Sequence, residues 1–324
     1  MNSQYQKYDA NNNLLPPAIF IMGPTASGKT DLAIELRQHF PMELISVDSA
    51  LIYRGMDIGT AKPDAATLKA APHCLIDIRD PSEIYSVAQF RDDALVEMQR
   101  IQETGRIPVL VGGTMLYYRA LQYGLAKLPN ADPVIRQALL EESKQITWKG
   151  LHQRLAQCDP QSAERIHVND AQRIQRALEV YEITGIPLSQ HHQDAKQNAC
   201  PYNLLKIGLL PEERSWLHER IARRFKIMLE QGFLDEVERL YERGNLSIDL
   251  PAIRAVGYRQ AWEYISGNID FNTMQERAIV ATRQLAKRQI TWLRSEKELN
   301  VFNAQNSNLS SINQRVDAFL SSQR

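Results

Sequence analysis

The stretch AIFIMGPTASGKTDLAIELRQHF, residues 18–40, decides the fold class of this chain. Its first five residues are all apolar, which predicts a buried strand, and DLAIELRQHF has the apolar spacing of a helix. Between them, Gly23 to Thr30 match the pattern G-x-x-x-x-G-K-[ST]. A preceding strand and a following helix are the context in which this pattern forms a phosphate-binding loop. The segment therefore predicts the first strand, loop and helix of a phosphate-binding α/β domain.

Further apolar runs indicate that this first strand belongs to a parallel sheet. Near-continuous apolar strands are typical of sheets covered on both faces, and helical patterns separate these runs. Ser86 is predicted to cap the helix before the fourth strand, and Gly105 to end it. The expected fold class is α/β, a P-loop parallel sheet with helices on both faces and an inserted all-helical domain. The runs are ELISV (43–47), HCLIDI (73–78), IPVLVGG (107–113) and LLKIGLL (204–210).

The character of the sequence changes after Gly124, and this change sets the expected domain organisation. The segment that follows is polar and helical, and Asp132 and Asp170 are predicted to cap two of its helices. The final segment is rich in Ser, Asn and Gln, and we expect it to be peripheral. The expected parts are a disordered extension (1–16), a catalytic core with C-terminal helices (17–124 and 200–300), a helical insertion (125–199) and a peripheral tail (301–324).

Composition excludes several classes of protein. The 324 residues carry a formal net charge of zero, so the whole molecule is not a polycation for nucleic acid, although a local basic face remains possible. Three widely spaced cysteines argue against a disulfide framework. No apolar run is long enough to span a membrane, and the N-terminus lacks a secretory signal. We expect a cytoplasmic protein, with no membrane contact, that is monomeric.

The loop residues have the chemistry that a diphosphate needs. Glycines let backbone N–H groups curl around phosphate oxygens, and the helix N-terminus adds partial positive charge. Lys29 supplies a mobile cation, and the Thr30 hydroxyl can bind Mg²⁺. Such loops most often bind ATP or GTP, but the pattern itself does not say which phosphates are held. The predicted diphosphate-binding residues are Gly23, Pro24, Thr25, Ala26, Ser27, Gly28, Lys29 and Thr30.

Two polar residues follow neighbouring strands at the carboxyl edge of the predicted sheet. Asp48 is placed to act as a general base or to hold magnesium, and it is equally well placed to cap a turn. Thr114 follows Gly112 and Gly113, which allow close backbone approach, and it is either a site residue or a helix cap. Further along, Arg220, Arg223 or Arg224 on an amphipathic helix is a candidate clamp for phosphate oxygens, or a solvated side chain.

Basic helices recur in separate regions of this neutral chain. From Ile253 to Arg294 there are seven Lys/Arg against three Asp/Glu. Arg283, Lys287 and Arg294 fall on one helical stripe, and Ala286, Ile290 and Leu293 make the apolar side of the helix. The segment QRIQRALE adds Gln and Arg side chains, which suit RNA phosphates and base edges. Together these segments favour an RNA-binding face, and solvated helix faces are the alternative.

Six ordered segments of the chain resemble the tRNA dimethylallyltransferase family, also called tRNA isopentenyltransferases. The resemblance covers about residues 19–294, which leaves the N-terminal extension and the tail outside it. It is far more specific than a phosphate loop alone. The segments are GPTASGKT, ISVDSALIYRGMDIGTAKP, VLVGGTMLYYRAL, NDAQRIQRALEVYEITG, IRAVGYRQAW and TRQLAKRQITWLR.

The resemblance implies a reaction and a role for each site residue. The family transfers a dimethylallyl group from dimethylallyl diphosphate to the exocyclic amine of adenosine 37 in tRNA, giving N6-dimethylallyladenosine and diphosphate, and requires Mg²⁺. Asp48 would accept the proton of the amine, Thr114 would lie beside the reacting centre, and Arg224 would clamp the diphosphate with the loop. Thr30 would bind the metal. The helical insertion and the C-terminal helices would contact the anticodon stem-loop.

The family's tRNA-contacting elements map onto six parts of this sequence. The match that carries Arg136 is the shortest of them. Met115 departs from the Gly expected in many members, and this local change leaves Thr114 in place. The predicted tRNA-contacting residues are Asp48, Ser49, Ala50, Leu51, Thr114, Arg136, Gln172, Arg173, Ile174, Gln175, Arg176, Arg254, Ala255, Val256, Gly257, Tyr258, Arg259, Lys287, Arg288, Gln289, Ile290, Thr291, Trp292, Leu293 and Arg294.

Two other functions share part of this pattern. A small-molecule P-loop kinase would have the same sheet, loop and aspartate, but it would not need the Gln/Arg and Lys/Arg helices. A regulatory nucleotide-binding module would need an apolar strand that ends in Asp, for which CLIDIRD, with Asp77 inside the predicted strand, is the nearest candidate. The later segments favour the transferase over both.

Overall fold

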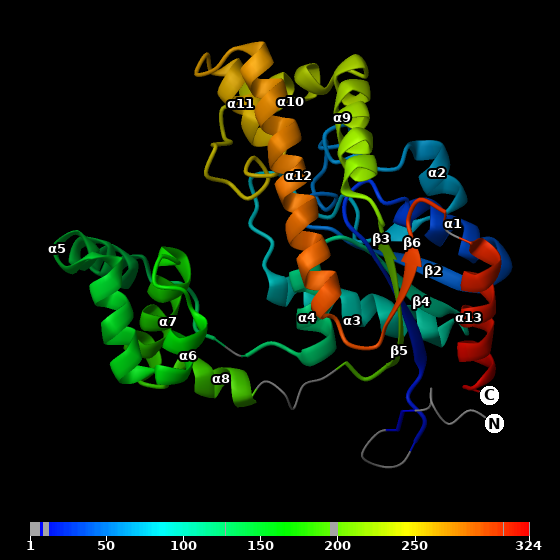
Figure 1. Ribbon diagram of the computed structural model, residues 1–324, viewed down its shortest axis with the longest axis horizontal. Helices are drawn as coiled ribbons and strands as arrows, with labels where there is room; N and C mark the ends of the chain where they lie inside the picture. Colours follow the sequence, from blue (N-terminus) through cyan, green and yellow to red (C-terminus); the bar gives the residue numbers. More distant parts are fainter. Residues whose placement is uncertain (1–6, 9–12, 127, 195–199, 307, 324) are drawn as a thin grey trace. The chain divides into compact units, whose positions relative to one another are not determined.

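A six-stranded parallel sheet forms the centre of the fold (Figure 1). The computed structural model describes residues 7–8, 13–126, 128–194, 200–306 and 308–323. The strand order is β3-β2-β4-β1-β5-β6, and every neighbouring pair is parallel. The predicted fold class is confirmed. The strands are β1 (Pro17–Met22), β2 (Met42–Val47), β3 (His73–Cys74), β4 (Ile107–Gly112), β5 (Asn203–Leu210) and β6 (Leu299–Asn303).

The helices begin where the sequence supplies capping side chains. Ser86 and Gln89 form a reciprocal capping box, and Asp132 and Asp170 each accept from backbone N–H groups of the helix that follows. The helices are α1 (Lys29–His39), α2 (Ala65–Ala70), α3 (Val87–Glu103), α4 (Met115–Tyr123), α5 (Pro133–Cys158), α6 (Pro160–Arg165), α7 (Ala171–Thr184), α8 (Leu188–Asp194), α9 (Arg214–Glu230), α10 (Phe233–Glu242), α11 (Tyr258–Ile265), α12 (Phe271–Ser295) and α13 (Leu309–Ser321).

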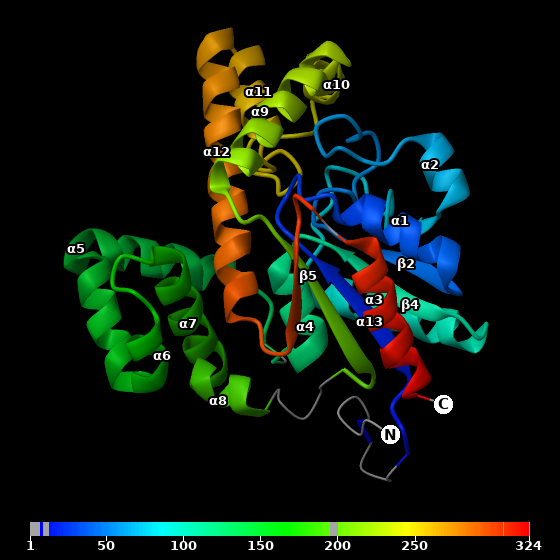
Figure 2. The same cartoon turned by 45° about the vertical axis from the view of Figure 1, so that its right-hand side comes forward.

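Helices cover both faces of the sheet, as near-continuous apolar strands require. On one face, α1 and α13 pack against Ile19 and Ile21 of β1 in a single buried cluster (Figure 2). On the other face, Phe20 packs against Tyr118 of α4, and Phe90 of α3 stacks on Tyr117. Alternate residues of β1 therefore enter two separate apolar layers, which leaves the carboxyl edge of the sheet for polar residues.

The third strand is shorter than its apolar run predicts. HCLIDI at 73–78 is expected as a strand, but only His73 and Cys74 are extended and paired with β2. Leu75 and Asp77 have positive φ angles of 63° and 57°, which turn the backbone out of the sheet. Asp77 then lies beside the loop that follows β2, where it pairs with Lys62.

The expectation of a peripheral tail at 301–324 is wrong. Residues Leu299–Asn303 form β6, which pairs with β5 at the edge of the sheet. In α13, Ile312, Val316 and Phe319 are essentially fully buried against the strands. Their spacing gives this polar segment one narrow apolar face, which is enough to bury a helix. The C-terminal segment is thus part of the core.

Truncating Phe319 to Ala is expected to destabilise the protein by about 3–5 kcal/mol, because a fully buried aromatic ring is lost and a cavity remains. Denaturant unfolding followed by circular dichroism measures the change. Val301→Ala is the control, since Val301 is 57% exposed and its loss should cost about 0.5 kcal/mol or less. Equal, small effects at both positions would restore the view of the tail as peripheral.

The chain folds as two compact units. The first comprises residues 1–118 and 201–324 and contains the sheet. The second, residues 119–200, contains α5 to α8 around a small core that includes Leu139, Leu151 and Leu178. Within α5 the backbone breaks at Thr147, where φ is 63°. The all-helical insertion predicted from the sequence is present as this second unit.

The first residues of the chain fall partly outside the described ranges. Of the predicted disordered extension, 1–6 and 9–12 are not described; Tyr8 and Leu14 form an isolated antiparallel bridge, and Lys7 pairs with Glu298. Within the described parts of the chain, none of the helices has the length and apolarity needed to cross a bilayer.

Candidate active site

The phosphate-binding loop connects β1 to α1 in a tightly turned conformation. The strand ends at Met22, and α1 begins at Lys29 behind Gly28, whose φ of 86° places it in the left-handed region. Ala26 also has a positive φ, 63°, so the backbone curls as a phosphate cradle requires. The Lys29 ammonium donates to the carbonyl of Pro24 at 3.3 Å, within the loop itself.

A cavity of about 180 Å³ opens beside this loop and is lined by two of the three predicted catalytic residues, Asp48 and Arg224, whereas Thr114 does not line it. It lies within the sheet-containing unit and draws on residues far apart in the sequence. Its polar lining includes Lys29, Asp48 and Arg224. Its remaining lining comprises Thr25, Ala26, Thr30, Ser46, Ala50, Leu51, Gly59, Thr60, Ala61, Pro63, His73, Ile76, Val111, Gly112, Ile221, Phe225, Met228, Phe233, Ala255, Val256, Gly257, Tyr258, Thr282, Leu285 and Gln289.

Two partly buried cations line this cavity, and desolvation shifts the pKa of both. Desolvation lowers the pKa of Lys29 to about 8; the Arg224 cation lowers it too, while Asp48 opposes the shift. Desolvation likewise lowers the pKa of Arg224, against the Asp48 carboxylate. Two desolvated cations around one carboxylate leave a positive site that an anionic ligand would satisfy. This charge favours a diphosphate.

Asp48 has one oxygen fixed and one available. Its Oδ1 accepts the backbone N–H groups of Ala50 at 2.9 Å and Leu51 at 3.4 Å, so the turn role considered for this residue is real. Its Oδ2 accepts no hydrogen bond from the described residues. Asp48 is only partly buried and lines the cavity. The side chain is therefore oriented by the turn while one oxygen remains free to accept a proton.

Thr114 and Gln289 form hydrogen bonds that join segments at the ends of neighbouring strands. The Thr114 hydroxyl accepts the N–H of Ser49 at 3.1 Å, which joins the ends of β2 and β4. Gln289 of α12 accepts the N–H of Thr25 at 2.9 Å and donates to the carbonyl of Gly113 at 2.8 Å. One buried amide thus holds the phosphate-binding loop against the segment that carries Thr114. A Cβ at Gly112 would lie 2.0 Å from a backbone oxygen of β2, which explains the glycine there.

The far wall of the cavity is apolar. Helix α9 presents Ile221, Phe225 and Met228 on the face that also carries Arg224, and Phe233 and Leu285 complete the surface. Phe225 and Phe233 meet edge to face at 6.0 Å. Apolar side chains next to desolvated cations suit a ligand with an anionic head and a short hydrocarbon chain.

Sequence reasoning missed the loop Gly59–Ala61 and the buried Glu236 that contacts it. The loop lines the cavity, and the carbonyl of Thr60 accepts a hydrogen bond from Arg224 at 3.3 Å. Glu236 is 3% exposed although it is charged. The segment DIGTAKP was visible in the sequence, but nothing local to it indicates a partner at position 236, some 180 residues away.

Burial divides the predicted tRNA-contacting residues of the sheet-containing unit into two groups. Tyr258, Gly257, Gln289, Ile290 and Leu293 are buried and lie beneath the outer surface of this unit, and their contact with tRNA stays a prediction. Several of these line the cavity or support it, as do Ala50, Leu51, Ala255 and Val256. Trp292 is half-buried. The exposed members are Ser49, Arg254, Arg259, Lys287, Arg288, Thr291 and Arg294.

In the helical unit, the predicted contacts converge on one buried carboxylate. Glu179 is fully buried and pairs with Arg136 at 2.9 Å and with Arg176 at 2.7 Å. Ile174 is buried, whereas Gln172 and Arg173 are exposed. Gln175 donates to the carbonyl of Arg136 at 3.0 Å. These arginines are therefore held in fixed orientations at the surface of the unit, which is how arginines that bind phosphates are commonly presented.

The chain is similar over nearly its whole length to transferases named for tRNA. A family model described as IPP transferase matches residues 51–296. The tRNA dimethylallyltransferase of Thioalkalivibrio sulfidiphilus is 58% identical over 309 residues, covering 95% of this chain and 97% of that protein.

Two solved structures share the fold. The tRNA isopentenylpyrophosphate transferase of Bacillus halodurans is 37% identical with a TM-score of 0.70, covering 95% of this chain and 97% of its own. A eukaryotic dimethylallyltransferase acting on tRNA is 26% identical with a TM-score of 0.77, covering 95% of this chain and 80% of its own.

Proposed function

The chain belongs to the IPP transferase family of tRNA dimethylallyltransferases, and from this premise we propose how its cavity performs the family's reaction. The enzyme transfers the dimethylallyl group of dimethylallyl diphosphate to adenosine 37 of tRNA and releases diphosphate. One observation carries the proposal: a single cavity is lined by the phosphate-binding loop, by Asp48, by Arg224 and by an apolar wall. A prenyl diphosphate has the matching anionic and hydrocarbon ends.

The phosphate-binding loop and two cations hold the diphosphate. Backbone N–H groups of Gly23 to Thr30 and the N-terminus of α1 surround its oxygens, and Lys29 and Arg224 neutralise its charge. This charge matters most as the allylic C–O bond breaks, because the leaving diphosphate then gains negative charge. The apolar side chains of α9, with Phe233 and Leu285, enclose the five-carbon chain and keep water from the allylic carbon.

The residues at the loop fit a magnesium ion. Thr30 and Ser46 line the cavity and offer hydroxyl oxygen atoms, which magnesium accepts as ligands, and the buried Ser46 hydroxyl has no hydrogen-bond partner among the described residues. No group of three or more His, Cys, Asp or Glu side chains in the described chain forms a metal site, so the substrate's phosphates would supply the other ligands. When bound there, magnesium supplies charge neutralisation of the diphosphate.

Asp48 accepts the proton of the adenine amine. The amine nitrogen forms a bond to the allylic carbon as the C–O bond to diphosphate breaks, and the amine proton moves to the free Oδ2 of Asp48. Thr114, at the end of β4, stays beside this carboxylate and holds the backbone of Ser49. The target adenine leaves its stacked position to enter the cavity, as enzymes that act on bases require.

Exposed and partly exposed basic residues are the proposed contacts to the tRNA. We propose Arg254, Arg259, Lys287, Arg288 and Arg294 in the sheet-containing unit, and Arg136, Arg173 and Arg176 in the helical unit, as contacts to the anticodon stem-loop. Their charges steer a polyanion to a chain that has no net charge overall. The protein acts as a monomer in the cytoplasm, where its tRNA substrates occur.

A transfer assay tests this function directly. Purified protein is incubated with Mg²⁺, radiolabelled dimethylallyl diphosphate and unmodified tRNA that has adenosine at position 37. Label should appear in the tRNA, and the same tRNA with guanosine at position 37 should remain unlabelled. ATP turnover without label transfer would contradict the proposal in favour of a kinase.

The KM for dimethylallyl diphosphate is expected to rise as pH increases through about 8. The lowered pKa of Lys29 means that its ammonium is present below pH 8 and is lost above it in the free enzyme. Because the diphosphate needs the charged form, binding above pH 8 requires uptake of a proton, and affinity falls by up to about tenfold per pH unit.

Steady-state kinetics between pH 7 and 9.5 measures this effect. Lys29→Arg serves as the comparison, because a guanidinium keeps its charge throughout this range and its KM should stay flat, even if it is higher overall. The same rise in both proteins would assign the pH dependence to another group.

A further inference from the structure

The loop from Asp57 to Lys62 forms one wall of the cavity and orients a cation. Gly59, Thr60 and Ala61 line the cavity, and the Thr60 carbonyl accepts from Nη2 of Arg224 at 3.3 Å. Arg224 is partly buried, and the hydrogen bond to this carbonyl helps to fix its guanidinium. Any shift of the loop therefore moves the hydrogen-bond acceptor of Arg224.

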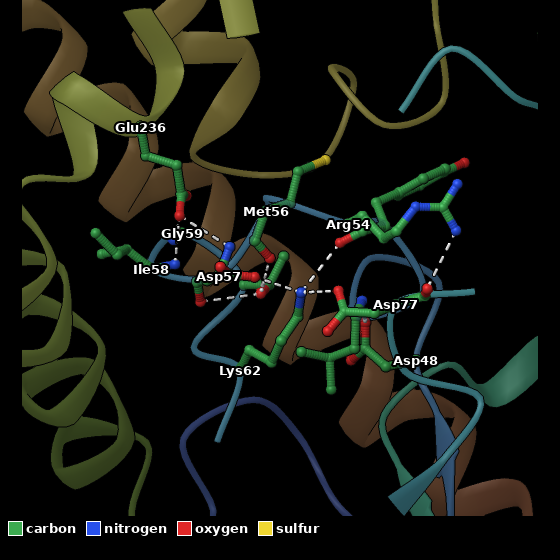
Figure 3. A network of polar contacts seen from close by, with 12 residues as sticks. Asp48, Arg54, Met56, Asp57, Ile58, Gly59, Lys62, Asp77 and Glu236 are labelled. Carbon is green, nitrogen blue, oxygen red and sulfur yellow. Dashed lines mark hydrogen bonds and ion pairs between the residues drawn. The ribbon is translucent and has the colours of Figure 1, made fainter. Parts of the chain in front are cut away.

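The side chain of Glu236, on α10, accepts hydrogen bonds from the backbone of this loop (Figure 3). Its Oε2 accepts the N–H groups of Asp57 and Ile58, both at 2.8 Å, and its Oε1 accepts the N–H of Gly59 at 3.1 Å. The Tyr258 hydroxyl donates to Oε1 at 2.5 Å. Three consecutive backbone donors and one hydroxyl thus converge on a single buried carboxylate.

Lys62 fixes the other end of the loop. Its side chain is 4% exposed, and its ammonium lies 2.5 Å from the carboxylates of both Asp57 and Asp77 and 3.0 Å from the carbonyl of Tyr53 (Figure 3). These partners all belong to the segments that follow β2 and β3. Lys62 therefore anchors the loop to the sheet side, whereas Glu236 anchors it to α10.

The four hydrogen bonds at position 236 require a carboxylate. Both oxygens act only as acceptors, so all four donors are satisfied, and hydrogen bonds to a charged acceptor are stronger than neutral ones. Burial and the adjacent Glu236 carboxylate raise the pKa of Tyr258, which keeps its hydroxyl protonated as a donor. Packing is equally close: a Cβ at Gly59 would lie 2.2 Å from the ring of Phe233.

We propose that Glu236 is a positioning residue for the diphosphate, acting through the Asp57–Gly59 backbone and the Thr60 carbonyl on Arg224. Glu236 itself is not among the residues that line the cavity. The proposal rests on the role proposed above for Arg224, because a misplaced loop weakens diphosphate binding only if Arg224 helps to hold it. The effect should then appear in the binding of the diphosphate and not in the binding of tRNA.

The first test is Glu236→Gln, measured by calorimetry with pyrophosphate and Mg²⁺ and by KM for dimethylallyl diphosphate. The amide has one acceptor where the carboxylate has two, so at least one loop N–H loses its partner. We expect the Kd for pyrophosphate and the KM for dimethylallyl diphosphate to rise by about 10- to 100-fold, because small misplacements of binding groups have effects of this size. The Kd for tRNA should be unchanged. Glu238→Gln is the matched control, since Glu238 is exposed on the same helix.

A double-mutant cycle distinguishes positioning from general destabilisation. In an Arg224→Gln background, Glu236→Gln should change pyrophosphate affinity by less than about twofold, because the group through which it acts is gone. The proposal is overturned if the losses of pyrophosphate affinity in the two single variants multiply fully in the double variant. It is also overturned if Glu236→Gln alone binds pyrophosphate as tightly as the wild type does. If Glu236→Gln unfolds below the assay temperature, Glu236→Asp carries the same cycle, because it keeps the charge but cannot reach all the donors. A wild-type protein without transferase activity would instead refute the proposed function.

Discussion

Replacing Asp48 with Asn is expected to lower the single-turnover rate of dimethylallyl transfer by about 10²- to 10⁴-fold, the range that general bases contribute. The adenine amine is a weak nucleophile, because its lone pair is delocalised into the ring. Its proton must leave as the new bond forms, and Asp48 presents a free oxygen inside the cavity. An amide of the same shape cannot accept that proton.

Asp48→Asn tests the role of Asp48 as a base more specifically than Asp48→Ala would. The Oδ1 of Asp48 also accepts the N–H groups of Ala50 and Leu51, and an Asn side chain keeps that acceptor while it removes the base. The turn should therefore survive, and the Kd for tRNA, measured by filter binding, should change by less than about threefold. Asp92→Asn is the control, since Asp92 on α3 is 75% exposed at its side chain.

Two other outcomes would change the role of Asp48. If Asp48→Asn keeps its rate, the residue is a turn former and the base lies elsewhere. If the rate and tRNA binding fall together, the carboxylate serves mainly to shape the surface that receives the tRNA. A single-turnover measurement with saturating dimethylallyl diphosphate separates these cases, because it isolates the chemical step from product release.

The sequence predicts what is local and strongly patterned. The strand, loop and helix at residues 18–40 follow from apolar runs around two glycines, and the caps at Ser86, Asp132 and Asp170 follow from short-range chemistry. Such elements depend on neighbours within a few residues, so a reading along the chain finds them. The family resemblance then adds what no spacing supplies, the substrate and the assignment of Arg224 among three nearby arginines.

The sequence does not predict which side chains meet across the fold. Gln289 lies on a basic helix that favours RNA binding, yet it is buried and holds Thr25, 264 positions away. Tyr258 lies in another predicted RNA-contacting segment and instead donates to buried Glu236. Both results come from packing between distant segments, and the polarity of a residue alone does not reveal them.

The C-terminal segment shows how average composition misleads. Its Ser, Asn and Gln residues suggest a peripheral tail, but Ile312, Val316 and Phe319 recur at helical spacing and reach the core. Three buried residues suffice because the sheet already supplies the rest of the apolar surface. Periodicity was the signal, and average polarity concealed it.

Replacing Lys29 with Ala is expected to lower kcat/KM for dimethylallyl diphosphate by about 10²- to 10³-fold, the cost of removing one preorganised charge from a water-excluded site. Lys29 is partly buried beside the phosphate-binding loop, where desolvation lowers the pKa of its ammonium to about 8. The enzyme thus holds a cation that is poorly solvated before the substrate arrives. The diphosphate replaces the missing water, and its charge increases further as the C–O bond breaks.

The matched control is Lys226→Ala, which removes the same charge from α9 at a side chain that is 76% exposed, and it should leave kcat/KM within about twofold. Lys29→Ala should also become more stable or change little in thermal unfolding, because a desolvated charge is removed along with its hydrogen bond to Pro24. Pyrophosphate should stabilise the wild type against heat through mass action, and this stabilisation should largely disappear in Lys29→Ala. Loss of activity with the pyrophosphate effect intact would mean that Lys29 acts on the transition state alone, because ground-state binding of the diphosphate would then not need it.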